Sequence, residues 1–287
     1  MKLPFAIDLN GKVAVVTGGG GVLCAELAAA LAANGAKVAV LDLNAEVAEK
    51  TAGALREGGA SAIGVSANVL ERRPLENAAE RVLKELGPCD LLLNGAGGNH
   101  PSGTTSKEWF EPSDLADKSL TTFFDLDPKA VEFVFNLNFL GTLLPTLVFA
   151  QQMIGRAGYS IINVSSMNAI CPLTKIPAYS GAKAAVSNFT QWLAVHFSRV
   201  GIRVNALAPG FFLTDQNRRL LIDEATGEFT PRARKIIEHT PMGRFGESRE
   251  LIGTLLWLVC EEASGLSTEW SYRSTGGSPP TQASDRV

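Results

Sequence analysis

The 287-residue sequence is poor in the residues that bind metals or build disulfide frameworks. It has three histidines and four cysteines, and the cysteines lie far apart with no Cys-x-x-Cys pair. These spacings argue against a structural zinc site and a disulfide scaffold, so we expect no bound metal and four buried, unreactive thiols. No uninterrupted apolar run reaches the roughly 18 residues of a membrane span, and the amino-terminal stretch lacks the apolar core of a signal peptide. We therefore expect a cytoplasmic protein.

An excess of charge of one sign is also missing. The chain has 26 lysines and arginines against 29 aspartates and glutamates, which leaves a net charge of -3. This near balance disfavours nucleic acid and anionic membranes as partners. With 46% hydrophobic and 19% charged residues, the composition fits a domain with a substantial core.

What the sequence does contain is a regular alternation of strand-like and helical patterns. Short β-branched or apolar runs occur at 13–17, 37–42, 61–66, 89–94, 160–165 and 202–209, with amphipathic stretches between them. Continuous apolar strands are typical of burial on both faces, and intervening helices are typical of parallel crossovers. We predict an α/β fold of the Rossmann type, a doubly wound parallel sheet in one domain over residues 1–264.

The stretch 99–130 breaks this alternation. It follows the fourth predicted strand and contains few apolar residues in any regular spacing. Long excursions at the carboxyl end of a strand are where α/β enzymes place substrate loops, so we predict that role here. A solvated insertion without a function stays open as the alternative.

The first predicted strand runs into a glycine turn and a helix, "VAVVTGGGGVLCAELAAALA". Glycines let the backbone approach a pyrophosphate, and a helix N-terminus favours its negative charge. Asp42 ends the second strand, where a carboxylate accepts hydrogen bonds from the ribose hydroxyls of NAD and repels the 2′-phosphate of NADP. No arginine follows it, so the sequence favours NAD. Alternatively, Asp42 only caps the next helix together with Asn44.

A second group of polar residues follows the fifth strand. Tyr179 and Lys183 are four residues apart, so they share one face of a helix. A neighbouring ammonium lowers the pKa of a phenol from its usual value of about 10 toward the working range of an acid–base catalyst. Ser166, at the end of the strand, can hold a substrate oxygen beside that phenol. This set can polarise a carbonyl and transfer a proton while a nicotinamide carries hydride.

With these motifs in this order, residues 8–264 resemble the short-chain dehydrogenase/reductase family. In the first turn, which reads TGxxxGxG in the family, Val22 and Cys24 stand where later glycines fall, and Gly21 would serve one position early. The family's NNAG motif corresponds to "NGAG" at 94–97, with Gly95 for the second Asn. Asn68 stands where the family has an adenine-side Asp.

The resemblance implies the roles of many residues and a homotetrameric assembly. It implies four catalytic residues, Asn138, Ser166, Tyr179 and Lys183. In this set Asn138 holds a water in a proton relay to Lys183. It implies a cofactor site made of Thr17, Gly18, Gly20, Gly21, Val22, Leu23, Asp42, Asn68, Val69, Asn94, Gly95, Ala96, Gly97, Tyr179, Lys183, Pro209, Gly210 and Phe212, the last three from the family's PG segment beside the nicotinamide.

Longer stretches give a narrower resemblance. "NGAGGNHP", "SSMNA", "PLTKIPAYSGAKAA" and "HTPMGRFG" are similar to D-mannonate oxidoreductases, also called fructuronate reductases. The implied reaction interconverts D-mannonate and D-fructuronate with NAD. The nearest alternative is another sugar-acid or polyol dehydrogenase, such as a gluconate 5-dehydrogenase. A non-catalytic Rossmann binding protein is the alternative of another class, although all four catalytic positions are occupied.

A sugar acid needs a cation or a cluster of donors for its carboxylate and polar partners for its hydroxyls. Among the candidates we rank His100 and Lys175 first, and we expect His196 to be a packed histidine outside the site. Other interpretations stay open: His100 caps its loop, Lys175 is solvated, or Arg218 pairs with a neighbouring aspartate. The candidate substrate residues are Asn99, His100, Asn168, Lys175, Gln216, Asn217 and Arg218.

The stretch 265–287, "GLSTEWSYRSTGGSPPTQASDRV", lacks the apolar pattern of the helix before it. The family resemblance implies a final edge strand and a PVDGG-like turn here, and neither is recognisable. Suitable codons for this stretch, read in another frame, encode "FVNGVVVPVDGGFSAYSGV" and then a stop. We therefore hypothesise a frameshift near residue 265, with the last strand missing and the tetramer weakened. The nucleotide sequence tests this.

Overall fold

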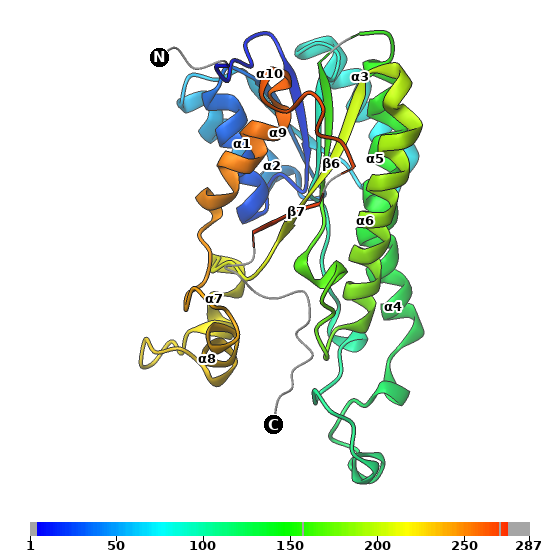
Figure 1. The fold of residues 1–287 in the computed structure, drawn as a ribbon, viewed down its shortest axis with the longest axis vertical. Coiled ribbons are helices and arrows are strands. Elements are labelled where there is room, and N and C mark those ends of the chain that lie inside the picture. The colour runs from blue at the N-terminus through cyan, green and yellow to red at the C-terminus, as the bar shows by residue number, and fades with distance from the viewer. Residues whose placement is uncertain (1–4, 157, 270, 275–287) are drawn as a thin grey trace.

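The structure is a computed structural model that describes residues 5–156, 158–269 and 271–274. Its centre is a parallel sheet in the order β3-β2-β1-β4-β5-β6-β7 (Figure 1). The strands are β1 Val13–Thr17, β2 Lys37–Asp42, β3 Ala62–Ser66, β4 Leu91–Asn94, β5 Tyr159–Val164, β6 Ile202–Pro209 and β7 Ser271–Ser274. The first six begin and end within two residues of the predicted runs.

Helices cover both faces of this sheet, as Figure 1 shows with α1, α2 and α9 on one side and α3, α5 and α6 on the other. Residues alternate along β1: Val13 and Val15 enter the core under α3, α5 and α6, while Ala14 and Val16 enter the core under α1, α2 and α9. The predicted doubly wound Rossmann-type fold is therefore confirmed. The helices are α1 Val22–Ala33, α2 Ala45–Glu57, α3 Arg72–Glu85, α4 Pro128–Phe135, α5 Gly141–Phe149, α6 Pro177–Phe197, α7 Asp215–Leu221, α8 Pro231–Glu238, α9 Ile252–Val259 and α10 Glu261–Ser264.

The predicted excursion lies at the carboxyl end of the sheet. It contains only short 3₁₀ turns, at Pro101–Gly103, Pro112–Ala116 and Phe123–Asp125, before α4 begins at Pro128. Helix α4 thus takes up the last three residues of the stretch that we expected to be loop. In Figure 1 the excursion reaches the same end of the molecule as α7 and α8, which follow β6. Two insertions therefore flank the end of the sheet where a dinucleotide fold places its ligands.

The expectation that the sheet lacks its last strand is wrong. Strand β7 pairs in parallel with β6, from Ala206 opposite Ser271 to Pro209 opposite Ser274. Backbone N–H and C=O groups make such a ladder, so it forms without an apolar sequence pattern. The Tyr272 ring adds an edge-to-face contact with Trp257 of α9, with the ring centroids 5.0 Å apart. A polar stretch therefore covers the edge of β6.

Arg203 of β6 holds the segment that leads to this strand. The side chain is buried, and its guanidinium donates to the carbonyl oxygens of Leu258 at 2.7 Å, Ser264 at 3.2 Å and Ser267 at 3.3 Å. These carbonyls lie around the ends of α9 and α10, where helical partners run out. The cation thus satisfies several acceptors and fixes the chain before β7.

Two features of the same segment are unfavourable. Leu266 is fully exposed, and Glu269 has a φ of 63°, in the left-handed region that non-glycine residues seldom adopt. Neither feature identifies the origin of the segment, so the frameshift stays a hypothesis. An intact reading frame in independent reads of the gene, with codons that do not encode the alternative sequence, would contradict it.

Among the described residues, one helical stretch, 128–153, is long and apolar enough to cross a membrane by length and composition alone. Half of its most apolar window is buried inside the fold. It runs through α4 and α5 on the outer layer beside α6.

Candidate active site

The glycine turn after β1 lies against the segment after β4. Gly18 has a φ of 62°, and a Cβ atom at this position would lie 2.8 Å from the Cα of Ala96. The Thr17 hydroxyl oxygen accepts hydrogen bonds from the backbone N–H groups of Gly95, at 3.1 Å, and Ala96, at 3.4 Å. The two segments can approach this closely only because residue 18 has no side chain.

The start of α1 forms a cradle in which side chains would not fit. A Cβ atom on Gly20 would lie 2.2 Å from the Val47 side chain. Gly21 is the N-cap of α1 and no side chain caps the helix, which begins with Val22 and Leu23. The first-turn N–H groups are thus left for a ligand, and the helix dipole favours an anion there. This geometry fits the pyrophosphate of a dinucleotide cofactor.

The departure from the family's glycine pattern has a compensating partner. A Cβ atom on Gly95 would lie 2.1 Å from the Sγ of Cys24. Cys24 is buried in α1, and its thiol fills the space that a side chain at position 95 would need. The two departures from the family pattern compensate each other in volume. Cys24 is larger than the glycine that the family has in the helix, and Gly95 is smaller than the family's Asn in the NNAG segment. The contact sets how closely α1 approaches the 94–97 segment.

The Asp42 carboxylate lies at the end of β2, beside the glycine turn. One oxygen accepts a hydrogen bond from the Gly20 N–H at 3.1 Å, and the other accepts one from the Asn44 N–H at 3.1 Å. Asn44, not Asp42, caps α2, because its side chain accepts from the N–H groups of Glu46 and Val47. Asp42 therefore braces the turn and remains at the ribose position of the predicted cradle.

On the adenine side, Asn68 turns into its own loop. Its Oδ1 accepts from the Leu70 N–H at 3.0 Å, and its Nδ2 donates to Glu71 at 2.7 Å. The neighbouring Val69 is buried, 3.1 Å from where a Cβ atom on Gly141 would lie. The side-chain amide of Asn68 is therefore engaged in a turn, and the contact of Val69 with an adenine ring stays a prediction.

Asn94 is the last residue of β4, and its side chain is buried. Its Nδ2 donates to Asn163 of β5 at 2.9 Å and to Thr146 of α5 at 3.0 Å. Asn163 in turn donates to Thr190 of α6 at 2.9 Å. The first Asn of the motif thus cross-links two strands and two helices in the buried layer, while Gly95, Ala96 and Gly97 carry the chain past the cofactor cradle.

The structure brings Ser166, Tyr179 and Lys183 together at the carboxyl end of β5. Ser166 forms a side-chain hydrogen bond with Tyr179, and the Lys183 Nζ lies 5.7 Å from the centre of the tyrosine ring. The Lys183 Nζ also donates to the backbone carbonyl of Val164 at 2.7 Å. All three groups predicted for proton transfer therefore share one small site.

The electrostatics differ from the sequence-based expectation. Burial raises the pKa of Tyr179, and the hydrogen bond from Ser166, rather than the lysine, is the contact that lowers it. Burial also lowers the pKa of Lys183 to about 8. Burial penalises both charged forms, so the phenol is mainly protonated and poised to donate.

Asn138 lies in a single π-helical turn, Asn136–Leu140, between α4 and α5. Its amide group donates to the carbonyls of Gly98 at 2.7 Å and Val134 at 2.8 Å. A Cβ atom on Gly97 would lie 2.6 Å from its Oδ1 and 3.2 Å from the Lys183 Nζ. The side chain thus fixes the backbone next to the lysine, and its part in a water relay stays a prediction.

The PG segment lies at the carboxyl end of β6. The Gly210 N–H donates to the Ser274 carbonyl at 2.8 Å, next to the pairing of Pro209 with Ser274. The Phe212 ring is buried under Gly246, where a Cβ atom would lie 2.7 Å from it. This segment therefore borders the site on the side of β7.

Two predicted substrate residues are engaged within the excursion. The Nδ1 of His100 accepts from the Ser102 N–H at 3.2 Å, which caps a 3₁₀ turn, and its ring packs edge-on against Phe133. Asn99 donates to the Thr104 hydroxyl at 3.0 Å. The capping interpretation of His100 is thus the one that the structure favours.

Asn168 lies two residues beyond Ser166 and is buried. Its backbone N–H donates to the Ser166 hydroxyl oxygen at 3.2 Å. Among the described residues its side-chain Oδ1 has no hydrogen-bond partner, so it can accept from a donor. Of the predicted substrate residues it lies nearest in sequence to the Ser166 hydroxyl.

The remaining candidates lie on or near α7. Arg218 is exposed, Asn217 closes the start of the helix by accepting from the Thr214 N–H at 2.9 Å, and the side chain of Gln216 lies outside the described residues. His196 is not packed inside as we expected. It is exposed on α6 and stacks on the exposed Trp192, with the ring centroids 4.7 Å apart.

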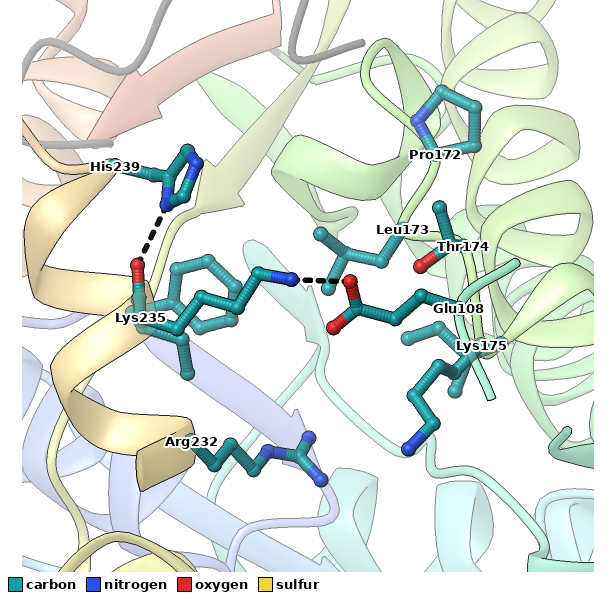
Figure 2. Close-up of a pocket in the computed structure, with 11 residues that line it drawn as sticks. Glu108, Pro172, Leu173, Thr174, Lys175, Arg232, Lys235 and His239 are labelled. Atoms are coloured by element: carbon teal, nitrogen blue, oxygen red, sulfur yellow. Dashed lines mark hydrogen bonds and ion pairs between the residues drawn. The ribbon is translucent and has the colours of Figure 1, made fainter. Parts of the chain in front are cut away.

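A pocket of about 230 Å³ opens beside the start of α6 (Figure 2). Its walls are the loop before α6, Phe211 after β6, one face of α8, and Glu108 from the excursion. Figure 2 shows Lys235 reaching across to the Glu108 carboxylate, while the Arg232 and Lys175 side chains extend below that pair in the view. The lining residues are Glu108, Pro172, Leu173, Thr174, Lys175, Ile176, Phe211, Arg232, Lys235, Ile236 and His239.

Of the predicted substrate residues, only Lys175 lines this pocket. Glu108 and three residues of α8 and its end were not predicted from the sequence; the three are Arg232, Lys235 and His239. The run "PRARKIIEH" resembles an ordinary amphipathic surface helix, so its charges give no signal of their own. Its place shortly after the PG segment was the usable clue, because insertions there flank the carboxyl end of the sheet.

The four cysteines are free and buried. Burial raises the pKa of Cys24 to about 12 and also raises that of Cys89, so both thiols stay protonated. Among the described residues, no group of three or more His, Cys, Asp or Glu side chains is arranged to hold a metal ion.

Comparison with known proteins identifies the family. Residues 12–225 match the sequence model of the short chain dehydrogenase family. An oxidoreductase of Haemophilus influenzae without an assigned substrate is 55% identical over 259 residues, which is 90% of each chain. A crystal structure from the same organism, provisionally named a D-mannonate oxidoreductase and containing NAD, is 52% identical with a TM-score of 0.90 and covers 94% of this chain and 95% of its own. A gluconate 5-dehydrogenase from Burkholderia cenocepacia, solved with NADP and tartrate, is 28% identical with a TM-score of 0.77 and covers 94% and 96%.

The chain belongs to the short-chain dehydrogenase/reductase family. It is an oxidoreductase that uses a nicotinamide dinucleotide and acts on a CH–OH group or the corresponding carbonyl. The alternative of a non-catalytic binding protein is set aside.

Proposed function

We propose that this enzyme interconverts D-mannonate and D-fructuronate with NAD as the cofactor. In the oxidative direction, D-mannonate and NAD⁺ give D-fructuronate, NADH and a proton. The observation that carries the proposal is a cation-lined pocket whose wall includes Lys175 and Ile176, the end of the loop that leads into the helix of Tyr179 and Lys183. The similarity over almost the whole chain to a protein provisionally named for this reaction supports the same substrate.

The chain's own residues supply the proton chemistry. Tyr179 donates its phenolic proton to the carbonyl oxygen during reduction and takes the hydroxyl proton during oxidation. Ser166 holds the same substrate oxygen, and the Lys183 ammonium stabilises the phenolate that remains. The nicotinamide, when bound, supplies or accepts the hydride. Asn138 keeps the backbone at 97–98 in place beside the lysine.

A sugar-acid panel tests the proposal. The purified protein is given NAD⁺ with D-mannonate, D-gluconate and a neutral polyol, and the formation of NADH is followed by absorbance. We expect D-mannonate to give the highest kcat/KM. A higher value for D-gluconate would favour the gluconate 5-dehydrogenase alternative, and no rate with D-mannonate or D-fructuronate from a folded sample would refute the assignment.

We further propose that Asp42 selects NAD over NADP. Removing the carboxylate in Asp42→Ala deletes two potential ribose contacts and the repulsion of a 2′-phosphate. The ratio of kcat/KM for NAD to that for NADP should fall by about 10-fold or more, since hydrogen bonds to charged groups contribute about 1.5–3 kcal/mol. Glu46→Gln removes an exposed carboxylate in the first turn of α2 and serves as the control. An unchanged ratio in Asp42→Ala would show that another group reads the ribose.

The pH profile tests the role of Lys183. Its pKa is lowered to about 8, so its charge is present below that pH and is lost above it. An ammonium stabilises the phenolate as it forms; Lys183→Met should therefore lower oxidative kcat/KM most below pH 8, where wild type carries the charge, and less above it. Lys183→Arg, which keeps a cation, should shift the profile less. Superimposable profiles for wild type and Lys183→Met would contradict the assignment.

The family resemblance also leads us to propose a homotetramer. Large apolar side chains lie exposed along the outer helices, among them Phe133, Phe135, Leu147, Trp192 and Val195. Exposed aromatic and aliphatic side chains of this size are common at protein interfaces. Sedimentation at several concentrations measures the assembly, and a monomer throughout would refute it.

A further inference from the structure

We infer that Arg232 of α8 and Lys175 of the loop before α6 together bind the carboxylate of the substrate, from opposite walls of the pocket. The inference rests on the proposed function and adds to it the residues that select an acid. Neither the family motifs nor the sequence pattern points to Arg232.

The charges of the pocket favour an anion. Its ionised lining groups are three cations, Lys175, Arg232 and Lys235, and one anion, Glu108. The other walls are mainly apolar side chains, such as Leu173, Phe211 and Ile236. Lys175 is half-buried and Arg232 is exposed, so both can attract a carboxylate that enters from the solvent.

Glu108 forms an ion pair with one of the three cations of the pocket. Its carboxylate pairs with the Lys235 Nζ, and the pair links the excursion to α8 across the pocket (Figure 2). Lys235 is thus already neutralised by its partner. Within the described part of the chain, Arg232 and Lys175 have no ion pair. Two uncompensated cations therefore remain for a ligand.

The two elements that carry these cations lie on opposite sides of the pocket (Figure 2). Lys175 lies four residues before Tyr179, in the loop that leads into α6, and Arg232 lies in the first turn of α8. A sugar acid with one hydroxyl at Tyr179 can extend its carboxylate into this pocket. Arginine offers a planar pair of donors that matches a carboxylate, and lysine adds a point charge.

The test compares D-mannonate with D-mannonamide, which has nearly the same shape without the charge. Wild type should prefer the acid in kcat/KM, and Arg232→Met should reduce that preference by about 10-fold or more, mainly through KM for the acid. Arg232→Lys should restore part of it, and Lys175→Met should reduce it as well. Arg234→Met is the matched control, because Arg234 is an exposed arginine of the same helix that pairs with Glu228 outside the pocket.

The outcomes separate this inference from the proposed function. One outcome is that Arg232→Met reduces kcat/KM equally for the acid and the amide while wild type still oxidises D-mannonate. That result would refute the role of Arg232 in carboxylate binding and leave the proposed reaction standing. A second outcome is that wild type binds D-mannonate by calorimetry without turning it over, and that Arg232→Met weakens this binding. That result would refute the proposed reaction and support carboxylate binding by Arg232. If the wild-type NADH complex does not bind D-mannonate at all, the proposed carboxylate site is refuted.

Discussion

Replacing Tyr179 by phenylalanine is expected to lower kcat by roughly 10²- to 10⁴-fold, the usual contribution of a general acid–base group. The variant removes one oxygen atom and keeps the ring, so packing beside Lys183 is preserved. NADH binding, followed by the change in its fluorescence, should be unaffected. The reaction must lose rate in both directions, because the same phenol gives the proton in reduction and takes it in oxidation.

Tyr159→Phe is a matched control for this experiment. Tyr159 is buried in β5, where its ring packs beside the Arg156 guanidinium, 5.0 Å from the ring centre, away from the predicted reacting groups. Loss of its hydroxyl should leave kcat near the wild-type value. Turnover of Tyr179→Phe within a few-fold of wild type would contradict the proposed proton transfer.

The second large effect concerns the fit between α1 and the segment after β4. Gly95→Ala would place a Cβ atom 2.1 Å from the Cys24 Sγ and 3.0 Å from the Thr17 carbonyl oxygen, so the thiol and its surroundings must shift. Overpacking of this kind costs about 1–3 kcal/mol of the free energy of unfolding. The displacement also opens the cofactor cradle, and the KM for NAD should rise with the loss of stability.

A double-mutant cycle isolates that contact. In a Cys24→Ala background the sulfur is gone, and Gly95→Ala should cost much less than it costs in wild type. Gly98→Ala is the control within the same segment, since its Cβ atom would make only an ordinary contact, 3.5 Å from Leu137. Equal costs of Gly95→Ala in both backgrounds, measured by thermal unfolding, would show that the thiol is not the obstacle.

Most of the fold could be predicted from the sequence because its strands are buried on both faces and separated by helices. Six strands follow that pattern, and the glycine turn marks the first crossover. Strand β7 could not be predicted, because an edge strand of four residues is held by backbone hydrogen bonds and by the contact of Tyr272 with Trp257. No hydrophobic pattern records such contacts.

The chemical part of the site was predictable for a different reason. Tyr179 and Lys183 lie one helical turn apart, so their proximity follows from local structure, and Ser166 lies two residues beyond the end of β5. The pKa of Tyr179 was not predictable, because its direction depends on how completely the fold buries the phenol. Likewise, Arg232 and Glu108 meet at one pocket only through the tertiary arrangement of two insertions more than 100 residues apart.

The most direct test is reduction of D-fructuronate by NADH with identification of the product. We expect one NADH to be oxidised for each D-fructuronate consumed, with D-mannonate as the product by chromatography against standards. The Tyr179→Phe variant should form D-mannonate far more slowly than wild type. A folded wild-type protein that leaves D-fructuronate unchanged, or that reduces it to a different epimer, would contradict the assignment.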